Sequence, residues 1–137
     1  MIESKIIRCL QEHAIKVIND KNIKCININF NPPVDKKWWE LIFIPNNPNN
    51  EFWSGDSKTY RGIFRIALYW PQKSQGIYKP LEELERVAKG FEKDTELFSE
   101  DGKVKIIITD TPNTTTISED KPYLIVGLTI KYSCFIM

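Results

Sequence analysis

Cys9 and His13 are the residues whose types and spacing come closest to a metal site. They lie four residues apart in a segment of apolar periodicity, so a helix there would turn both side chains toward the same side. A structural zinc normally takes four protein ligands, whereas the chain contains one histidine and no CxxC spacing. The pattern therefore favours a histidine on the flank of a helix beside a packed thiol, and we expect no metal site.

The sequence also lacks the residue patterns that are typical of other kinds of catalytic site. Glu82, Glu83 and Glu85 could in principle support acid–base chemistry, but their spacing among Lys and Arg is typical of a solvated helix face. Nucleophilic catalysis would need a base beside a Ser, Thr or Cys, and His13 is the single histidine. The six glycines are scattered and form no phosphate-binding loop. We expect no catalytic residue and no cofactor.

Arg61 and Arg65 are the charged pair that best suits a binding role. In an extended chain they project from one face, roughly 13 Å apart at about 3.3 Å per residue. Two interpretations stay open. The arginines are either solvated or salt-bridged within the molecule, or they contact an acidic patch on an adjacent copy of the chain.

Phe52 and Trp53 are two adjacent aromatic residues in a long segment, 45–58, that is rich in Asn and Pro. Loops of this length in a compact domain are usually functional or disordered. Two large aromatic side chains left in water would forgo burial worth roughly 1.5 to 3 kcal/mol each. We therefore expect them either to fold back on their own domain or to dock on a neighbouring subunit.

The segment 59–72 is the element around which the chain is organised. Tyr60, Phe64 and Leu68 fall on one face of an extended chain and the two arginines on the other, which predicts a central strand that Pro71 ends. Further periodic segments predict helices over 2–19 and from Pro80 to about Lys93, and strands over 24–30, 38–44, 103–109 and 123–136. A second long polar loop is expected over 110–122.

These elements predict one α+β domain spanning residues 1–137. Its sheet would be mixed or mostly antiparallel, with about five strands and both helices packed on one face. The strand over 38–44 has apolar residues on both faces. Such a strand lies near the middle of a sheet, or its second face is covered by an interface.

The composition of the chain indicates which partners and which cellular compartment to expect. The chain has 19 Lys and Arg against 18 Asp and Glu, which is far from the basic surplus that phosphate-backbone binding needs, so nucleic acid is not an expected partner. Its three cysteines are far apart and suit reduced, buried thiols. The N-terminus is charged throughout and the apolar runs are short, so we expect no signal peptide, no membrane span and synthesis in a cytoplasm.

One stretch of the chain carries a family resemblance. Its marks are the Asn-rich PNNPNN at 45–50, Tyr60-Arg61-Gly62, Trp70-Pro71, Gly76, Lys79-Pro80, and the cluster Phe91, Lys93 and Thr95. On these residues the chain resembles the tail terminator proteins of long-tailed bacteriophages and prophages. The N-terminal helix and the last strand agree in position and character. The resemblance covers about half of the chain by motif and the remainder by element order.

The resemblance implies a structural virion protein with no enzymatic activity. Tail terminators form a ring, typically of six copies, that caps the tail tube, stops its growth and presents the surface for the head and neck. The implied partners are therefore other copies of the chain, the tail-tube protein and a neck or head-completion protein, in the virion tail after assembly in the host cytoplasm. Alternatives are another neck or tail-completion subunit, the tube subunit itself, or a small-molecule-binding or enzyme domain.

Overall fold

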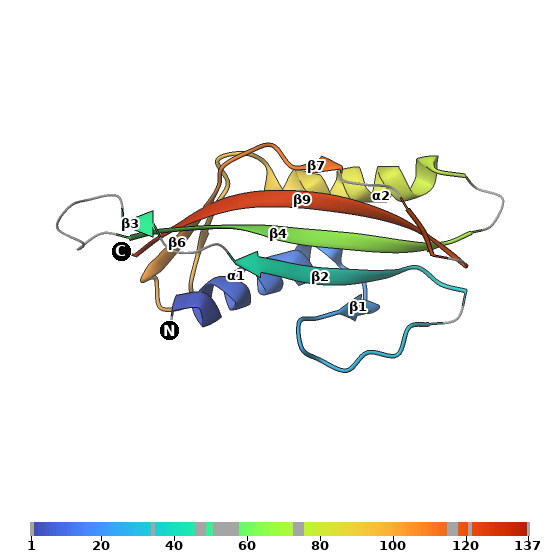
Figure 1. Cartoon of the computed structure of the whole chain (residues 1–137), viewed down its shortest axis with the longest axis horizontal. Helices are drawn as coiled ribbons and strands as arrows, with labels where there is room; N and C mark the ends of the chain where they lie inside the picture. Colours follow the sequence, from blue (N-terminus) through green and yellow to red (C-terminus); the bar gives the residue numbers. More distant parts are fainter. Residues whose placement is uncertain are drawn as a thin grey trace.

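One sheet and two helices make up the fold in this computed structural model (Figure 1). The structure describes residues 2–33, 35–45, 49–50, 58–72, 76–114, 118–120 and 122–136. The elements are α1 (Ile2–Ile18), β1 (Ile23–Lys24), β2 (Trp38–Pro45), β3 (Asn49–Asn50), β4 (Lys58–Pro71), α2 (Tyr78–Ala88), the 3-10 turn η1 (Lys89–Phe91), β5 (Glu96–Phe98), β6 (Val104–Ile108), β7 (Asn113–Thr114), β8 (Ser118–Asp120) and β9 (Tyr123–Ile136).

The sheet is built on two strands of 14 residues, β4 and β9. Its order is β1-β2-β4-β9-β6-β5, and the short strands β3, β7 and β8 pair with β4 or β9. All pairs are antiparallel except β1 with β2, which confirms a mixed and mostly antiparallel sheet. The central place of β4, between β2 and β9, is also confirmed. The expected number of about five strands was too low, because nine strands pair in the described residues.

Two segments expected to be loops account for part of this difference. β7 and β8 lie in the segment 110–122, where they pair with β9, and β3 lies in the segment 45–58, where it pairs with β4. Each of these strands has only two or three residues. Such short pairings are specified by the long strand beside them, so local polarity and turn residues do not reveal them.

The strand predicted over 24–30 is wrong. β1 ends at Lys24, and the chain then turns, with a backbone bond from Ile28 N–H to the Cys25 carbonyl at 3.4 Å. Asn27 adopts a left-handed conformation with φ of 57°, which asparagine tolerates better than most residues. The alternation of isoleucine and asparagine imitates a strand, but Ile28 is 58% exposed and belongs to the turn.

Both helices pack on the same face of the sheet, as predicted. α1 buries Ile6, Leu10, Ala14 and Ile18, and the left-handed Asn19 (φ 52°) follows its last turn. α2 begins at Tyr78, two residues before the predicted Pro80, and continues as η1 to Phe91 rather than to Lys93. The helices share one core with the inward residues of β2, β4, β6 and β9: Trp39, Leu41, Phe64, Ile66, Leu68, Ile106, Ile108, Val126, Leu128, Ile130, Tyr132 and Cys134.

The two helices contact each other closely where α2 passes into η1. Gly90 lies against Val17, so that a Cβ at position 90 would be 2.6 Å from both methyl carbons of Val17. Arg86 strengthens the contact by donating to the Val17 and Ile18 carbonyls, each at 2.9 Å, at the C-terminal end of α1. A cation there also interacts favourably with the helix dipole.

This contact leads to a stability prediction. Replacing Gly90 by alanine is expected to lower the free energy of unfolding by about 1 to 3 kcal/mol, because the added methyl overlaps the branched Val17 side chain. In a double-mutant cycle by urea denaturation, the penalty of Gly90→Ala should fall by at least about 1 kcal/mol in a Val17→Ala background. Strictly additive effects would show that the helices do not meet at this point.

Candidate functional site

The face of the sheet opposite the helices is the candidate functional site. In Figure 1 the sheet lies in front of α1 and α2, and no helix of the described chain covers its near side. We call this side the open face and define it by the outward residues of the three long strands. These residues are Trp38, Glu40, Ile42, Ile44, Arg61, Ile63, Arg65, Ala67, Tyr69, Tyr123, Ile125, Gly127, Thr129, Lys131 and Ser133.

Apolar side chains lie among the cations of the open face, since Ile63 shares a row with Lys131 and Ile42 shares a row with Arg65. Ile44 pairs in register with Ile63 of β4, and Ile42 lies one row further along. Ile44 is 42% exposed, and Ile42, Ile63 and Ile125 are half-buried. An antiparallel sheet that ends in water usually presents polar residues on its solvated face. The open face instead has the apolar content of a surface that another macromolecule covers.

Aromatic rings fix the end of the open face where β9 begins. Trp38 stacks on Tyr69 with centroids 3.8 Å apart and planes at 7°, and Phe30 and Tyr123 pack against the same indole. The Tyr69 hydroxyl donates to Glu40 Oε1 at 3.0 Å, and burial together with this bond raises the pKa of Tyr69 to about 12. Tyr123 donates to the Pro33 carbonyl at 2.8 Å. Hydrogen bonds therefore hold both tyrosine side chains in place at this end, and the Tyr69 hydroxyl stays protonated at neutral pH.

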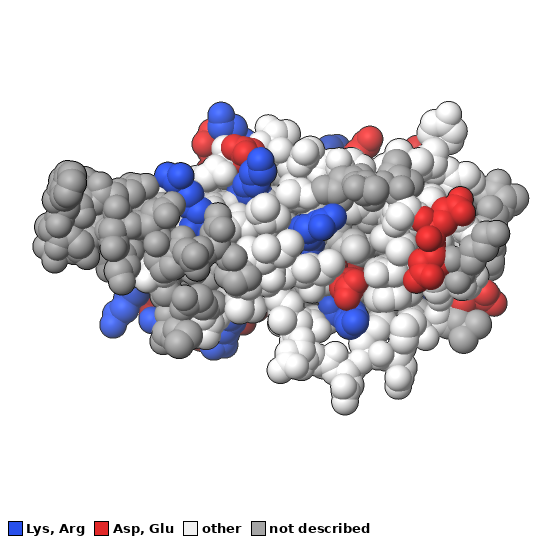
Figure 2. Space-filling view, viewed as in Figure 1, with Lys and Arg blue, Asp and Glu red and all other residues white. Residues whose placement is uncertain are grey.

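Charges of opposite sign lie at the two ends of the open face. Arg61, Arg65 and Lys131 occupy the half near the start of β4, and Lys131 is 3.7 Å from Asp110. At the other end of β9, Asp120 of β8 is in register with Tyr123 of the open face, whereas Glu119 is in register with the inward Leu124 and lines a hollow with Trp70. Figure 2 shows this face, with most of its Lys and Arg toward the left of the view, acidic side chains toward the right, and charged side chains of both signs near the middle. The open face thus carries isoleucines among its cations, Glu40 in its middle row and Asp120 at its far end.

The structure places only part of the predicted site. Arg61 and Arg65 project from the open face, as the alternation in 59–72 predicts, and Arg61 lines a shallow cavity of about 460 Å³ with Lys131 and Tyr132. Their role in an interface stays a prediction. Phe52 and Trp53 lie outside the described residues. The sequence interpretation missed Asp120, which β8 places beside Tyr123 at the far end of the open face.

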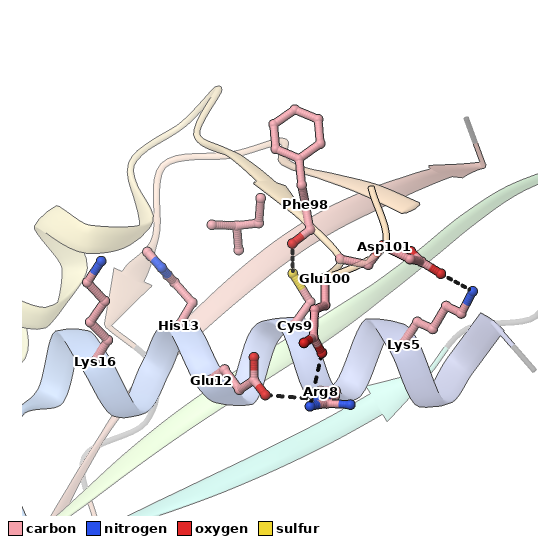
Figure 3. A pocket seen from close by; sticks show the side chains of 11 residues that line it. Lys5, Arg8, Cys9, Glu12, His13, Lys16, Phe98, Glu100 and Asp101 are labelled. Carbon is pink, nitrogen blue, oxygen red and sulfur yellow. Dashed lines mark hydrogen bonds and ion pairs between the residues drawn. The ribbon is translucent and has the colours of Figure 1, made fainter. Parts of the chain in front are cut away.

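A second hollow, of about 460 Å³, lies between α1 and the turn that joins β5 to β6 (Figure 3). Most of its charged side chains are paired with one another. Lys5 Nζ is 2.7 Å from Asp101 Oδ2, and Arg8 pairs with Glu12 at 2.9 Å and with Glu100 at 3.2 Å. The surface of this hollow is therefore a network of ion pairs that joins the helix to the turn.

Cys9 and His13 both line this hollow, but each bonds to a backbone carbonyl. The Cys9 thiol donates to the Phe98 carbonyl at 3.5 Å, and His13 Nε2 is 2.7 Å from the Gly90 carbonyl. Burial raises the pKa of Cys9, which keeps its sulfur protonated at neutral pH. No group of three metal-ligating side chains occurs in the described part of the chain. Both residues here link α1 to its neighbours.

Asp101 gives this network a measurable pH dependence. Its carboxylate accepts bonds from Lys5, from Ser99 Oγ at 2.6 Å and from the Lys103 N–H at 3.0 Å, which together hold its pKa well below the ordinary value of 3.8. Because the pKa of Asp101 is lower in the folded state than in the unfolded state, its ionised carboxylate stabilises the fold at pH values above the ordinary pKa. This contribution is lost as the pH falls from about 3.8 through the folded-state value.

The corresponding prediction concerns Lys5. Replacing Lys5 by alanine is expected to move the NMR titration midpoint of the Asp101 carboxyl carbon upward, toward 3.8, because the largest stabilising partner is removed. Lys16→Ala is the matched control, since Lys16 lines the same hollow without contacting Asp101. An unchanged midpoint in Lys5→Ala would contradict the observed pairing.

Glu83, one of the three α2 carboxylates considered for acid–base chemistry, is also part of the structural network. Glu83 Oε2 is 3.1 Å from Lys37 Nζ and 3.2 Å from Arg86 Nη2. Burial is the largest single influence and favours the protonated form, but the bonds and charges of Arg86 and Lys37 together lower the pKa of Glu83. An ionised, doubly paired carboxylate of this kind does not act as a general acid at neutral pH.

An uncovered sheet face that carries apolar side chains beside charged ones is typical of a protein that binds other macromolecules. Neither helix in the described residues has the length and apolar character that a membrane crossing requires. The family model of the phage tail terminator proteins matches residues 6–132. The chain therefore belongs to the phage tail terminator family and is a structural protein of a phage tail, as its motifs suggested.

Structural comparison supports the same fold. A solved structure without a functional name superposes with a TM-score of 0.74 at 15% sequence identity, over 99% of this chain and 94% of its own. At this identity the likeness concerns the fold alone. A search of curated proteins found no match.

Proposed function

We propose that the protein is the tail terminator itself: a ring of identical subunits, six by family resemblance, that caps the last ring of tail-tube subunits. The ring ends tube polymerisation and presents the surface to which the neck and head attach. The protein would be assembled in the bacterial cytoplasm and retained in the virion tail. The supporting observation is the open face, a sheet face that no helix of the described chain covers and that carries isoleucines beside cations, in a member of the tail terminator family.

The physical basis of this proposal is that a ring of identical subunits must close on itself. A ring of identical subunits needs a head-to-tail contact between two different patches, repeated by a rotation that closes. The two long strands give the subunit a rigid body, because β4 and β9 pair over twelve residues from Tyr60–Cys134 to Pro71–Tyr123. Such a body can hold the two patches at a fixed angle, and a fixed angle sets the number of copies.

The proposal is tested by removing the protein from its phage and by examining it alone. Electron microscopy of particles from a phage that lacks the gene should show overlong, headless tails, and light scattering of the concentrated protein should show a closed oligomer. Tails of normal length together with a purely monomeric protein would overturn the proposal. Polymerisation of the purified protein into long tubes would instead identify it as the tube subunit.

A further inference from the structure

We propose that one copy of the chain adds its strand β5 to the free outer edge of β2 on the next copy, so that the sheet continues from subunit to subunit. This inference rests on the proposed ring and names the backbone groups that hold it together. The contact joins residues 41–45 of one copy to Glu96–Phe98 of the next. Strand addition of this kind is a common way for one polypeptide to recognise a sheet edge.

The outer edge of β2 is covered over only part of its length. β1 pairs with Trp39 and Glu40, and no strand of the described chain pairs with residues 41–45 on the side away from β4. In Figure 1 the arrowhead end of β2 extends past β1 along the lower border of the sheet. The free stretch reads Leu-Ile-Phe-Ile-Pro and carries no charge. Proteins usually protect such an apolar edge with charged residues or with a covering chain.

The hydrogen bonds around this edge show which backbone groups it offers. Trp39 donates its N–H at 2.9 Å to the carbonyl of the residue before β1, so the odd-numbered residues of β2 direct their N–H and C=O groups outward. A longer β1 would bring the Ile26 N–H to the Leu41 carbonyl, but this N–H bonds instead to Gln11 Oε1 at 3.3 Å. The edge therefore offers, in chain order, the Leu41 carbonyl, the Phe43 N–H and the Phe43 carbonyl.

β5 offers the complementary groups at the opposite border of the sheet. Ile108 of β6 donates its N–H to the Thr95 carbonyl at 3.0 Å, so the odd-numbered residues of this segment face β6. Glu96 and Phe98 therefore direct their backbone groups outward. The Phe98 carbonyl already accepts the Cys9 thiol at 3.5 Å. The groups that β5 offers are, in chain order, the Glu96 N–H, the Glu96 carbonyl and the Phe98 N–H.

The two sets of groups match in number and order. In a parallel pair, the Glu96 N–H donates to the Leu41 carbonyl, and the Glu96 carbonyl accepts from the Phe43 N–H. The Phe98 N–H then donates to the Phe43 carbonyl. The next bond would need an N–H at Pro45, which proline lacks, and its acceptor would be the Phe98 carbonyl that α1 already contacts. The missing donor and the occupied acceptor therefore fall at the same step of the ladder.

This register also places apolar side chains beside each other on both faces of the extended sheet. Ile44 lies beside Phe98 on the open face, where both are exposed in the single copy, and Figure 3 shows the Phe98 ring directed away from α1. On the helix side Phe43 lies beside Leu97. β2 and β5 run in the same direction, because four antiparallel pairs connect them, and a rotation about an axis along the strands keeps that direction. The contact joins two different edges, as a closing ring requires.

Hydrogen exchange of the wild-type protein tests the pairing without a substitution. In dilute monomer the Phe43 and Phe98 amides should exchange quickly, whereas the Ile42 and Ile44 amides, which face β4, should be protected. Assembly at high concentration should slow both phenylalanine amides at least about tenfold and leave the two isoleucine amides unchanged. Mass spectrometry with single-residue fragmentation reads these amides in both states.

Disulfide trapping tests the register. Ile44→Cys with Phe98→Cys places the two Cα atoms about 4.8 Å apart across the new pair, within the range of a disulfide, and head-to-tail bonding should give a ladder beyond the dimer on a non-reducing gel. Ile44→Cys with Glu96→Cys is the matched control, because those Cα atoms would be roughly 8 Å apart and should be trapped at least about fivefold less. Each single variant controls for the native cysteines.

The outcomes separate this contact from the ring itself. If the wild type forms a closed oligomer while the exchange of the Phe43 amide is unchanged, or if this amide is already protected in the monomer, the edge pairing is wrong and the proposed ring stands. Equal trapping in the two double variants, or a ladder that stops at the dimer, also refutes the pairing. A wild type that stays monomeric at high concentration overturns the ring and this contact together.

Discussion

Replacing Ile44 by glutamate is expected to abolish self-association at micromolar concentration while the fold is retained. Ile44 is 42% exposed on the open face, beside Ile63 in the sheet register. Burial of an isoleucine contributes about 1.5 to 3 kcal/mol, and burial of an unpaired carboxylate costs more. Each subunit contact should therefore weaken by roughly 10- to 100-fold or more, since about 1.4 kcal/mol corresponds to tenfold.

Sedimentation velocity measures this loss of association, and circular dichroism checks the fold. Ile28→Glu is the matched control, because Ile28 is 58% exposed but lies in the turn after β1 rather than on the sheet. It should associate as the wild type does. If Ile44→Glu also assembles with wild-type affinity, the open face is not the subunit contact.

Replacing Phe91 by alanine is expected to lower the free energy of unfolding by about 3 to 5 kcal/mol. Phe91 is fully buried where η1 meets both α1 and the sheet. Its ring lies 4.8 Å from that of His13, edge to face, and 6.3 Å from that of Phe64 on β4. Truncation to alanine would leave a cavity between these three elements. The expected loss in the free energy of unfolding is a large share of the roughly 5 to 15 kcal/mol that stabilises a domain.

Chemical denaturation measures the effect of Phe91→Ala. Phe91→Leu is the graded control, because it keeps most of the buried volume and should cost clearly less than the alanine variant. A change below about 1 kcal/mol in Phe91→Ala would mean that this position is not at the centre of the core. Oligomer formation should be measured on the same samples, since loss of the fold would also abolish assembly.

Strong periodicity explains why the large elements could be predicted from the sequence. The stripe Ile6, Leu10, Ala14 and Ile18 recurs every four residues, and the structure buries all four in α1. The alternation of β4 likewise sends Phe64 inward and the arginines outward. These patterns are local, so they can be read without knowing the partners of each element.

The short strands could not be predicted in this way, because their pairing is set at long range. β5 has three residues, and β8 carries the exposed, acidic Ser118–Asp120, whose composition is that of a loop. The error over 24–30 has the opposite cause, since a locally convincing alternation is broken by the left-handed Asn27. In each case the local sequence pattern and the tertiary structure favour different conformations, and the tertiary structure determines which one forms.

The sequence likewise predicted some residues of the candidate site and missed others. The apolar residues on both faces of 38–44 predicted a strand near the middle of the sheet or an interface, and β2 does lie inside the sheet, between β1 and β4. The arginine pair left an interface open as one of two interpretations. Asp120, at the far end of the open face, lies on a short strand that is defined by its pairing with β9, so no local pattern placed it on this face. Phe52 and Trp53, the other predicted interface residues, lie outside the described residues and their docking stays a prediction.

The most direct test of this account is the length of tail tubes grown with and without the protein. The phage's purified tube subunit would be polymerised alone, with the wild-type protein, and with the Ile44→Glu variant, and tube lengths would be measured by negative-stain electron microscopy. We predict that the wild-type protein stops elongation and is visible as a ring on one tube end, whereas the variant leaves the lengths unchanged. Tubes that grow to the same length with the wild-type protein as without it would contradict the account.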